Sequence, residues 1–117
     1  MNWKLAGGQV EFWKNKKVIK IQFPDFWETA VKSKNHFYNV VKNSALDFLD
    51  KSKKETMSSC SNEFLQEFWH EHCDFCTEKI RTTEERVVYC TADFCWWMCS
   101  DCFEEFKQLL NISIIDN

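Results

Sequence analysis

The chain has 117 residues and a formal net charge of −3, with 44% hydrophobic and 28% charged residues. Domains of about 100–150 residues have one hydrophobic core, so this length predicts a single domain over residues 1–117. The composition excludes a disordered tail, a collagen-like repeat and a membrane bundle. Aromatic residues make up 16%, against two glycines and one proline, so we expect bulky rings to fill a tightly folded body.

The start of the chain and its apolar runs predict a cytoplasmic protein. Residues 1–9 lack the basic start and apolar stretch of a secretory signal. The longest apolar run, residues 94–99, is far shorter than the roughly 18 residues that span a bilayer. Thiols stay reduced in the cytoplasm, and seven cysteines cannot all pair. We therefore expect metal ligands among them rather than a set of disulfides.

Charge is distributed unevenly along the chain. Residues 1–54 hold eleven lysines and five acidic residues, whereas residues 73–117 hold four basic and nine acidic residues. A nucleic-acid-binding surface is usually basic, because phosphate contacts supply most of its affinity. The acidic cysteine-rich part would repel a phosphate backbone and attract a basic protein surface.

The first predicted unit is a β-hairpin. Residues 10–13 and 18–23 are two β-rich runs on either side of the polar residues 14–17. Pro24 then ends the second strand and favours a helix start, so we expect a short helix over residues 26–31.

Two further helices are expected before the cysteine motifs. Between residues 35 and 53, apolar residues recur at three- and four-residue steps, which predicts an amphipathic helix. The polar stretch 51–61 is expected to be a loop, with Cys60 as an inert residue near the start of the next helix. Residues 63–71 again carry their apolar side chains on one face and predict a third helix.

The strongest signal in the sequence is a pair of Cys-x-x-Cys motifs separated by 22 residues. Their four thiolates suit Zn²⁺ in a closed tetrahedral site. Four such ligands leave no position for a reacting water, so we predict a structural Zn²⁺. Within the one domain, residues 1–72 form the hairpin and helices and residues 73–117 form the zinc-binding unit. The predicted ligands are Cys73, Cys76, Cys99 and Cys102.

The segment between the two motifs predicts a second hairpin, and the second motif opens a helix. Residues 86–90 and 94–98 are β-rich runs around the turn residues 91–93. Residues 103–110 have the apolar spacing of an amphipathic helix.

A knuckle motif, a hairpin and a helix that starts at a second cysteine motif resemble a treble-clef zinc finger, here over residues 73–111. The resemblance implies that Cys73 and Cys76 are the knuckle ligands. It also implies that Cys99 and Cys102 are held at the helix start, where the helix dipole favours thiolate. Treble clefs serve binding, catalysis and structural stabilisation alike, so the resemblance does not specify a function. The predicted fold class is α+β, with the N-terminal hairpin and helices packed on this treble-clef-like unit.

The remaining cysteines and histidines allow several interpretations. Cys90 and Cys95 are buried small hydrophobic residues, a cross-strand redox pair, or replacements for a misassigned ligand. His70 and His72 directly precede the first motif, but four cysteines are sufficient for the metal. We interpret these histidines as surface residues at a helix end or as neighbours of the metal ligands.

No enzyme class is indicated. The chain lacks a Walker loop, a Gly-x-Ser-x-Gly elbow and a Gly-x-Gly-x-x-Gly loop. The adjacent carboxylates at residues 84–85 and 104–105 are typical of a solvated face rather than of an acid–base pair. We expect a binding protein and not an enzyme.

The acidic and aromatic C-terminal part favours a protein-binding module with a basic partner and no membrane. Trp96 and Trp97 must point to opposite sides of a strand, so one of them is expected to be exposed. Exposed tryptophans are favoured interface anchors, and we assign this contact to Trp97. The carboxylates expected to face the partner are Asp74, Glu84, Glu85, Asp93, Asp101, Glu104 and Glu105.

A small, acidic, ring-rich cytoplasmic protein is similar in general character to bacterial immunity proteins, which are antitoxins that neutralise a cognate toxin. The resemblance implies a positively charged, nuclease-like toxin as the partner. Association between the two would be fast, because opposite charges steer the encounter.

The alternative function is nucleic-acid binding by the lysine-rich N-terminal half. In this interpretation Trp13 stacks on a base. The spread of the lysines over several elements and the lack of any arginine before Arg81 weigh against it. The side chains expected on phosphates are Lys14, Lys16, Lys17 and Lys20.

Overall fold

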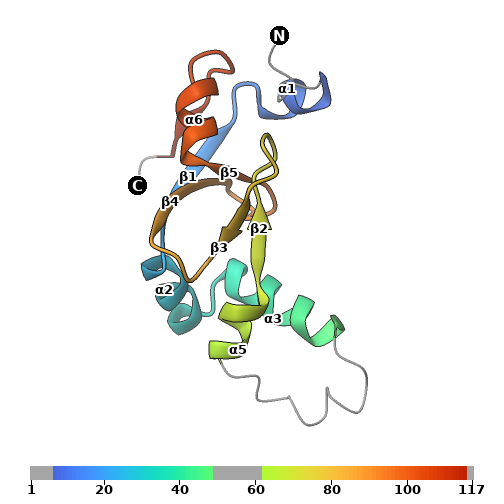
Figure 1. The fold of residues 1–117 in the computed structure, drawn as a ribbon, viewed down its shortest axis with the longest axis vertical. Helices are drawn as coiled ribbons and strands as arrows, with labels where there is room; N and C mark the ends of the chain where they lie inside the picture. Colours follow the sequence, from blue (N-terminus) through green and yellow to red (C-terminus); the bar gives the residue numbers. More distant parts are fainter. Residues whose placement is uncertain (1–6, 49–61, 116–117) are drawn as a thin grey trace.

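The computed structural model describes residues 7–48 and 62–115 as an α+β fold (Figure 1). The predicted loop 51–61, with Cys60, and the end of the helix predicted to reach residue 53 lie outside the described residues. No helix in the two described ranges is long and apolar enough to cross a membrane. The elements are α1 (Gly7–Trp13), β1 (Lys17–Phe23), α2 (Asp25–Ser33), α3 (His36–Phe48), α5 (Asn62–Phe68), β2 (His70–His72), β3 (Lys79–Arg81), β4 (Arg86–Thr91), β5 (Trp97–Cys99), α6 (Ser100–Phe106) and β6 (Ser113–Ile114).

Strand β1 joins the two halves of the chain. In the four-stranded sheet, with the order β5–β4–β1–β6, β1 pairs antiparallel with β4 from Val18 to Phe23 and parallel with β6. The second predicted hairpin is present as the antiparallel pair β4–β5, in which Cys90 lies opposite Trp97. Strands β2 and β3 form a separate two-stranded antiparallel sheet.

The prediction of an N-terminal hairpin is wrong. Residues 10–13 belong to helix α1, and β1 finds its partners in β4 and β6, which come from the other end of the sequence. In a helix, Val10 and Trp13 lie one turn apart on the same side, and both turn toward the core. Asn15, with a left-handed backbone (φ 62°), then turns the chain into β1 and donates its N–H to the Leu110 carbonyl. Tertiary packing therefore overrides the local β preference of this segment.

The three middle helices agree with the predicted ones. Helix α2 begins directly after Pro24, and α3 begins after Asn35, whose Oδ1 accepts the backbone N–H of Tyr38 over 3.1 Å as a helix cap. Helix α5 ends at Phe68, before the predicted residue 71, because the chain changes there to strand β2. The predicted apolar face of α3 is confirmed by its buried residues Phe37, Val41 and Ala45.

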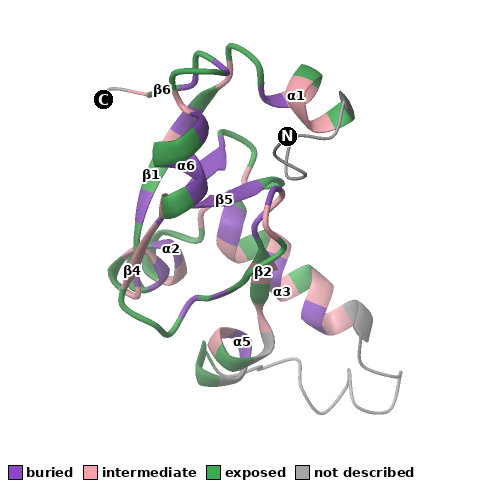
Figure 2. Cartoon of the chain, turned by 45° about the horizontal axis from the view of Figure 1, so that its top comes forward, coloured by how far each residue is buried: buried purple, intermediate pink, exposed green. Residues whose placement is uncertain are grey.

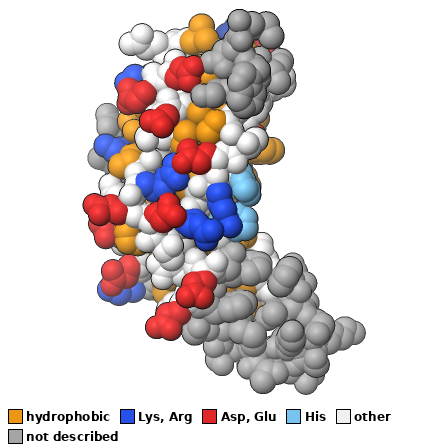
Figure 3. All heavy atoms as spheres, viewed as in Figure 1, with side chains coloured by type: hydrophobic (Ala, Val, Ile, Leu, Met, Phe, Trp, Pro, Cys, Tyr) orange, Lys and Arg blue, Asp and Glu red, His pale blue; other side chains and the backbone are white. Residues whose placement is uncertain are grey.

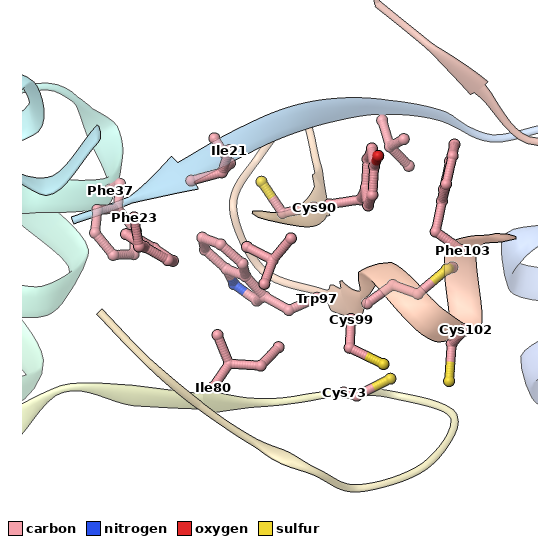
Figure 4. Packing of buried hydrophobic residues seen from close by; sticks show 14 of the residues in the cluster. Ile21, Phe23, Phe37, Cys73, Ile80, Cys90, Trp97, Cys99, Cys102 and Phe103 are labelled. Carbon is pink, nitrogen blue, oxygen red and sulfur yellow. The ribbon is translucent and has the colours of Figure 1, made fainter. Parts of the chain in front are cut away.

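The four-stranded sheet is covered on both faces. On one face, Phe23 stacks on Trp97 with ring centroids 5.8 Å apart, and Phe37 of α3 lies 5.5 Å from the same indole (Figure 4). On the other face, Tyr89 stacks on Phe103 of α6 at 3.8 Å. Helix α6 turns its buried residues toward the sheet and its exposed residues outward (Figure 2). Each fully buried large side chain contributes about 1.5–3 kcal/mol, so these rings hold helices and sheet in one body.

Candidate metal centre

Four cysteine side chains converge beside the start of α6. The sulfurs of Cys73, Cys76, Cys99 and Cys102 all lie within 4.8 Å of one another, and those of Cys76 and Cys99 are 3.7 Å apart. Figure 4 shows three of these residues meeting where the chain after β2 approaches α6. A tetrahedral site with metal–sulfur bonds of about 2.3 Å separates its sulfurs by about 3.8 Å, whereas a disulfide bond is about 2.05 Å long. The predicted set of four cysteines is therefore positioned to bind a metal ion.

The knuckle, residues 73–78, is the tight turn between β2 and β3 that carries the first two cysteines. The Thr77 N–H donates to the Cys73 carbonyl over 2.9 Å, and the left-handed backbone of Thr77 (φ 62°) reverses the chain. The Asp74 N–H donates to the Trp97 carbonyl, also over 2.9 Å. The knuckle is thus fastened to the strand that carries the third cysteine.

The second pair of cysteines lies at the junction of β5 and α6. Cys99 is the extended residue just before the helix (φ −71°, ψ 161°), and Cys102 lies in the first helical turn. Both are buried, as is Cys73, while Cys76 is half-buried. The protein body therefore screens most of the site from solvent.

Three of the four sulfurs, those of Cys73, Cys99 and Cys102, differ in how readily they ionise. Burial opposes ionisation of the Cys73 thiol, but the N–H groups of Cys76, Cys99 and Phe75 bond to its sulfur and lower its pKa. Burial raises the pKa of Cys99 to about 12, despite a hydrogen bond from the Cys102 N–H, and burial also raises the pKa of Cys102. The benefit expected from the helix start is thus outweighed by burial. Cys99 and Cys102 would ionise more readily beside a cation, and the soft set of four sulfur donors fits a divalent transition metal.

Cys90 and Cys95 lie outside this cluster. Cys90 is fully buried in β4 and burial raises its pKa, which agrees with the interpretation as a small hydrophobic residue. It faces Trp97 across the hairpin rather than Cys95, so the strand register does not form the alternative redox pair. Cys95 is exposed in the β4–β5 loop, where its N–H donates to Asp93 Oδ1 over 3.1 Å.

His70 and His72 are also separate from the four sulfurs. Both are exposed on β2, with ring centroids 5.1 Å apart. The Nδ1 atom of His72 lies 3.2 Å from the Thr77 carbonyl oxygen, so this ring contacts the knuckle without joining the cysteine cluster. Their position on a strand corrects the predicted place at a helix end.

The acidic residues predicted for partner binding lie on several elements. Glu84 and Glu85 are exposed in the β3–β4 loop, and Asp93 is exposed in the β4–β5 loop. Asp74 is half-buried in the knuckle. Figure 3 shows acidic side chains scattered over the visible face rather than gathered in one patch. The remaining three, all exposed on α6, are Asp101, Glu104 and Glu105.

Two predicted contact tryptophans are buried, and these assignments are wrong. Trp97 exposes only 1% of its surface, because it packs between Phe23 and Phe37 and its indole N–H bonds the Phe94 carbonyl. Its neighbour Trp96 is the exposed one, at 46%. Trp13, expected to stack on a base in the alternative function, is fully buried. The alternation of residues 96 and 97 is confirmed, but the choice of side is reversed.

Three residues beside the centre carry no signal in the sequence. Phe12 packs on Trp96 with ring centroids 5.2 Å apart, and Gln9 donates its side-chain amide to the Asp74 carbonyl. Both come from α1, the segment predicted as a strand, so no sequence pattern brings them near the knuckle. Burial raises the pKa of the third, Glu71, to about 7.

No protein-family model, curated protein or solved structure matches this chain. The site is a mostly buried set of four thiols between a knuckle, a strand end and a helix start, held by backbone hydrogen bonds.

Proposed function

We propose that the four cysteines bind Zn²⁺ in a site of the treble-clef type. The order of elements supports this, because a knuckle (residues 73–78) is followed by the hairpin β4–β5 and by a helix with cysteines at its start. Four sulfur ligands at the observed spacing suit zinc better than hard cations, which prefer oxygen.

The proposed zinc has a structural role. Four thiolates complete a tetrahedral shell and leave no place for a substrate or a reacting water. The ion would instead fasten the knuckle to β5 and α6, elements that are far apart in the sequence. We therefore propose that the protein is not an enzyme.

We further propose that this zinc-stabilised body is a protein-binding module for a basic partner, as in toxin-neutralising immunity proteins. The observation that carries the proposal is Trp96, a large ring that remains 46% exposed in a protein whose other tryptophans in the described residues are largely covered. Exposed carboxylates lie on several elements, among them the β3–β4 loop, the β4–β5 loop and α6, and they favour a positively charged partner. The nucleic-acid alternative is less favoured, because Trp13 is buried.

The test is association kinetics with a partner isolated from the native host. The immobilised protein captures partners, mass spectrometry identifies them, and the association rate of each basic one is measured from low to high salt. We expect the rate to fall about tenfold or more, since steering between opposite charges has this range. A rate independent of salt, or the absence of any basic partner, contradicts the proposal. A gel shift with single- and double-stranded probes tests the nucleic-acid alternative in parallel.

A further inference from the structure

A groove runs beside the knuckle, between helix α1 and the β4–β5 loop. It consists of two adjoining hollows of about 460 and about 360 Å³, and Gln9, Asp74 and Trp96 line both. Glu71 lines the larger hollow, and Phe12 lines the smaller one. We call this the Trp96 groove.

Trp96, the aromatic wall of the groove, is held by a contact of its ring and by hydrogen bonds of its backbone. The ring of Trp96 packs on Phe12, and the Trp96 N–H donates to the Thr91 hydroxyl over 3.2 Å. The Trp96 carbonyl accepts the N–H of Thr91 over 3.0 Å. The backbone of Trp96 is thus fixed and its ring packs on one neighbour, so this residue loses less conformational entropy on binding than a mobile side chain does.

The floor of the groove carries two carboxyl groups. Glu71 and Asp74 both line it, and no lysine or arginine among the described residues forms an ion pair with either of them. Among the described residues that line the larger hollow, His72 is the only basic one. One oxygen of Asp74 accepts the Trp13 indole N–H, which orients the carboxylate. The groove therefore offers two acidic groups that no described lysine or arginine pairs with, and Glu71 is only partly ionised at neutral pH because burial raises its pKa to about 7.

We propose that the Trp96 groove receives an arginine side chain from the basic partner, an inference that rests on the proposed function. A guanidinium group stacks on an indole face through a cation–π contact and donates paired hydrogen bonds to carboxylates. Its planar shape suits a site with an aromatic wall and an acidic floor better than a lysine ammonium does. Charge complementarity between the partner's arginine and Glu71 and Asp74 supplies the specificity.

The groove also depends on the cysteine site. The knuckle forms the floor of the groove, and the loop that leads into β5 carries Trp96, which forms its wall. Both segments lie close in sequence to cysteines of the cluster. Helix α1 is held over the knuckle by the bond from Trp13 to Asp74. The predicted metal ligands and the groove thus share the same backbone segments.

The probe for this proposal is a short blocked glycine peptide with one central arginine, titrated into the metal-loaded protein and followed by NMR. We expect the Trp96 indole signal to shift, and the same peptide with neutral citrulline to bind several-fold more weakly. Trp96→Leu keeps apolar bulk but removes the aromatic face. Glu71→Gln removes one acidic group, and the titration is run at about pH 8, where Glu71 is mostly ionised in the parent protein. Each substitution should weaken binding several-fold, while Leu109→Ala, at an exposed residue outside the groove, leaves it unchanged. Metal content and circular dichroism show that the variants are folded.

The outcomes separate the groove from the wider function. Equal shifts with the arginine and citrulline peptides, no shift at Trp96, or unchanged binding by Trp96→Leu overturns the proposal. If a native basic partner binds with a salt-dependent rate and Trp96→Leu binds it equally well, the groove is refuted and the binding function stands. If the arginine peptide binds as expected but no basic partner exists, the groove is supported and the immunity role is refuted.

Discussion

The indole Nε1 of Trp13 donates a hydrogen bond to Oδ2 of Asp74 over 2.6 Å. This contact joins the first helix to the knuckle, which lies more than half the chain away in sequence. The buried ring of Trp13 also packs on Phe75, with centroids 5.8 Å apart. One residue of α1 thus links the N-terminal segment to the loop that carries the first two metal ligands.

Replacement of Trp13 by phenylalanine should destabilise the protein. The substitution keeps an aromatic ring but leaves the Asp74 carboxylate without its indole donor, which costs about 1.5–3 kcal/mol for a hydrogen bond to a charged group. Asp74 is only half-buried, so we expect the lower part of this range. Urea unfolding measures the loss. Trp13→Phe also loses packing of the buried ring, so the matched control is the same substitution in an Asp74→Ala background, where the bond is already absent and only the packing loss remains. An equal loss in both backgrounds shows that the bond is unimportant.

Loss of one ligand should abolish stoichiometric metal binding. In Cys102→Ala, three sulfurs remain, so we expect the metal-to-protein ratio to fall from one to nearly zero on dialysis. Cys90→Ala removes an equally buried thiol from outside the cluster, and it should keep the full ratio. X-ray fluorescence of untagged protein measures the ratio and identifies the metal. Full metal content in Cys102→Ala would falsify the four-sulfur site.

A strong chelator should unfold the protein in part and not completely. Zinc bound to four thiolates contributes on the order of 10 kcal/mol in small zinc modules, so the knuckle and α6 should lose their structure. Helices α2 and α3 pack through rings that do not involve the cysteines, such as Trp27 and Phe37 with centroids 5.5 Å apart. We expect hydrogen exchange to accelerate in residues 73–81 and 99–106 and to stay slow in α3. A circular-dichroism melt that is unchanged after proven removal of the metal contradicts this expectation.

The cysteine cluster could be predicted from the sequence because its geometry is local. A Cys-x-x-Cys motif brings two sulfurs together within one turn, independently of the rest of the chain. The fold then has to bring only the two motifs into contact to complete the set of four. The same locality explains the success with α3, where the spacing of Phe37, Val41 and Ala45 and the capping residue Asn35 are sufficient. Each motif and the helix α3 depend on neighbours within four residues.

The N-terminal segment and the exposed tryptophan could not be predicted, because both depend on distant partners. Residues 10–13 have the composition of a strand, but in helix α1 Trp13 bonds to Asp74 and packs on Phe75, partners that lie far along the sequence. Alternation along a strand shows that Trp96 and Trp97 point apart. It does not show which side faces the core, and this is decided by Phe23 and Phe37. The Trp96 groove could not be predicted from composition or spacing either, because its lining comes from segments that are far apart in the sequence.

The stack of Tyr89 on Phe103, which closes the outer face of the sheet, leads to a prediction for alkaline pH. Burial raises the pKa of Tyr89 above its ordinary value of 10.0, and the Glu104 carboxylate adds to this, while Lys107 opposes it. The folded state therefore holds the phenolic proton more tightly than the unfolded state. Stability that is fully present below pH 10.0 is lost as the pH rises from there through the folded pKa.

Tyr89→Phe removes the titrating group and keeps the stacked ring, so its unfolding midpoint in urea should change less between pH 9 and pH 11 than that of the wild type. Tyr38→Phe, at the other tyrosine of the chain, should follow the wild type and controls for general effects of alkaline solution. The metal content of each sample is measured at both pH values, because loss of the ion would itself lower stability. Parallel pH profiles for the wild type and Tyr89→Phe would show that the Tyr89 hydroxyl ionises equally well in the folded and unfolded chain, and that the face under α6 is open to water.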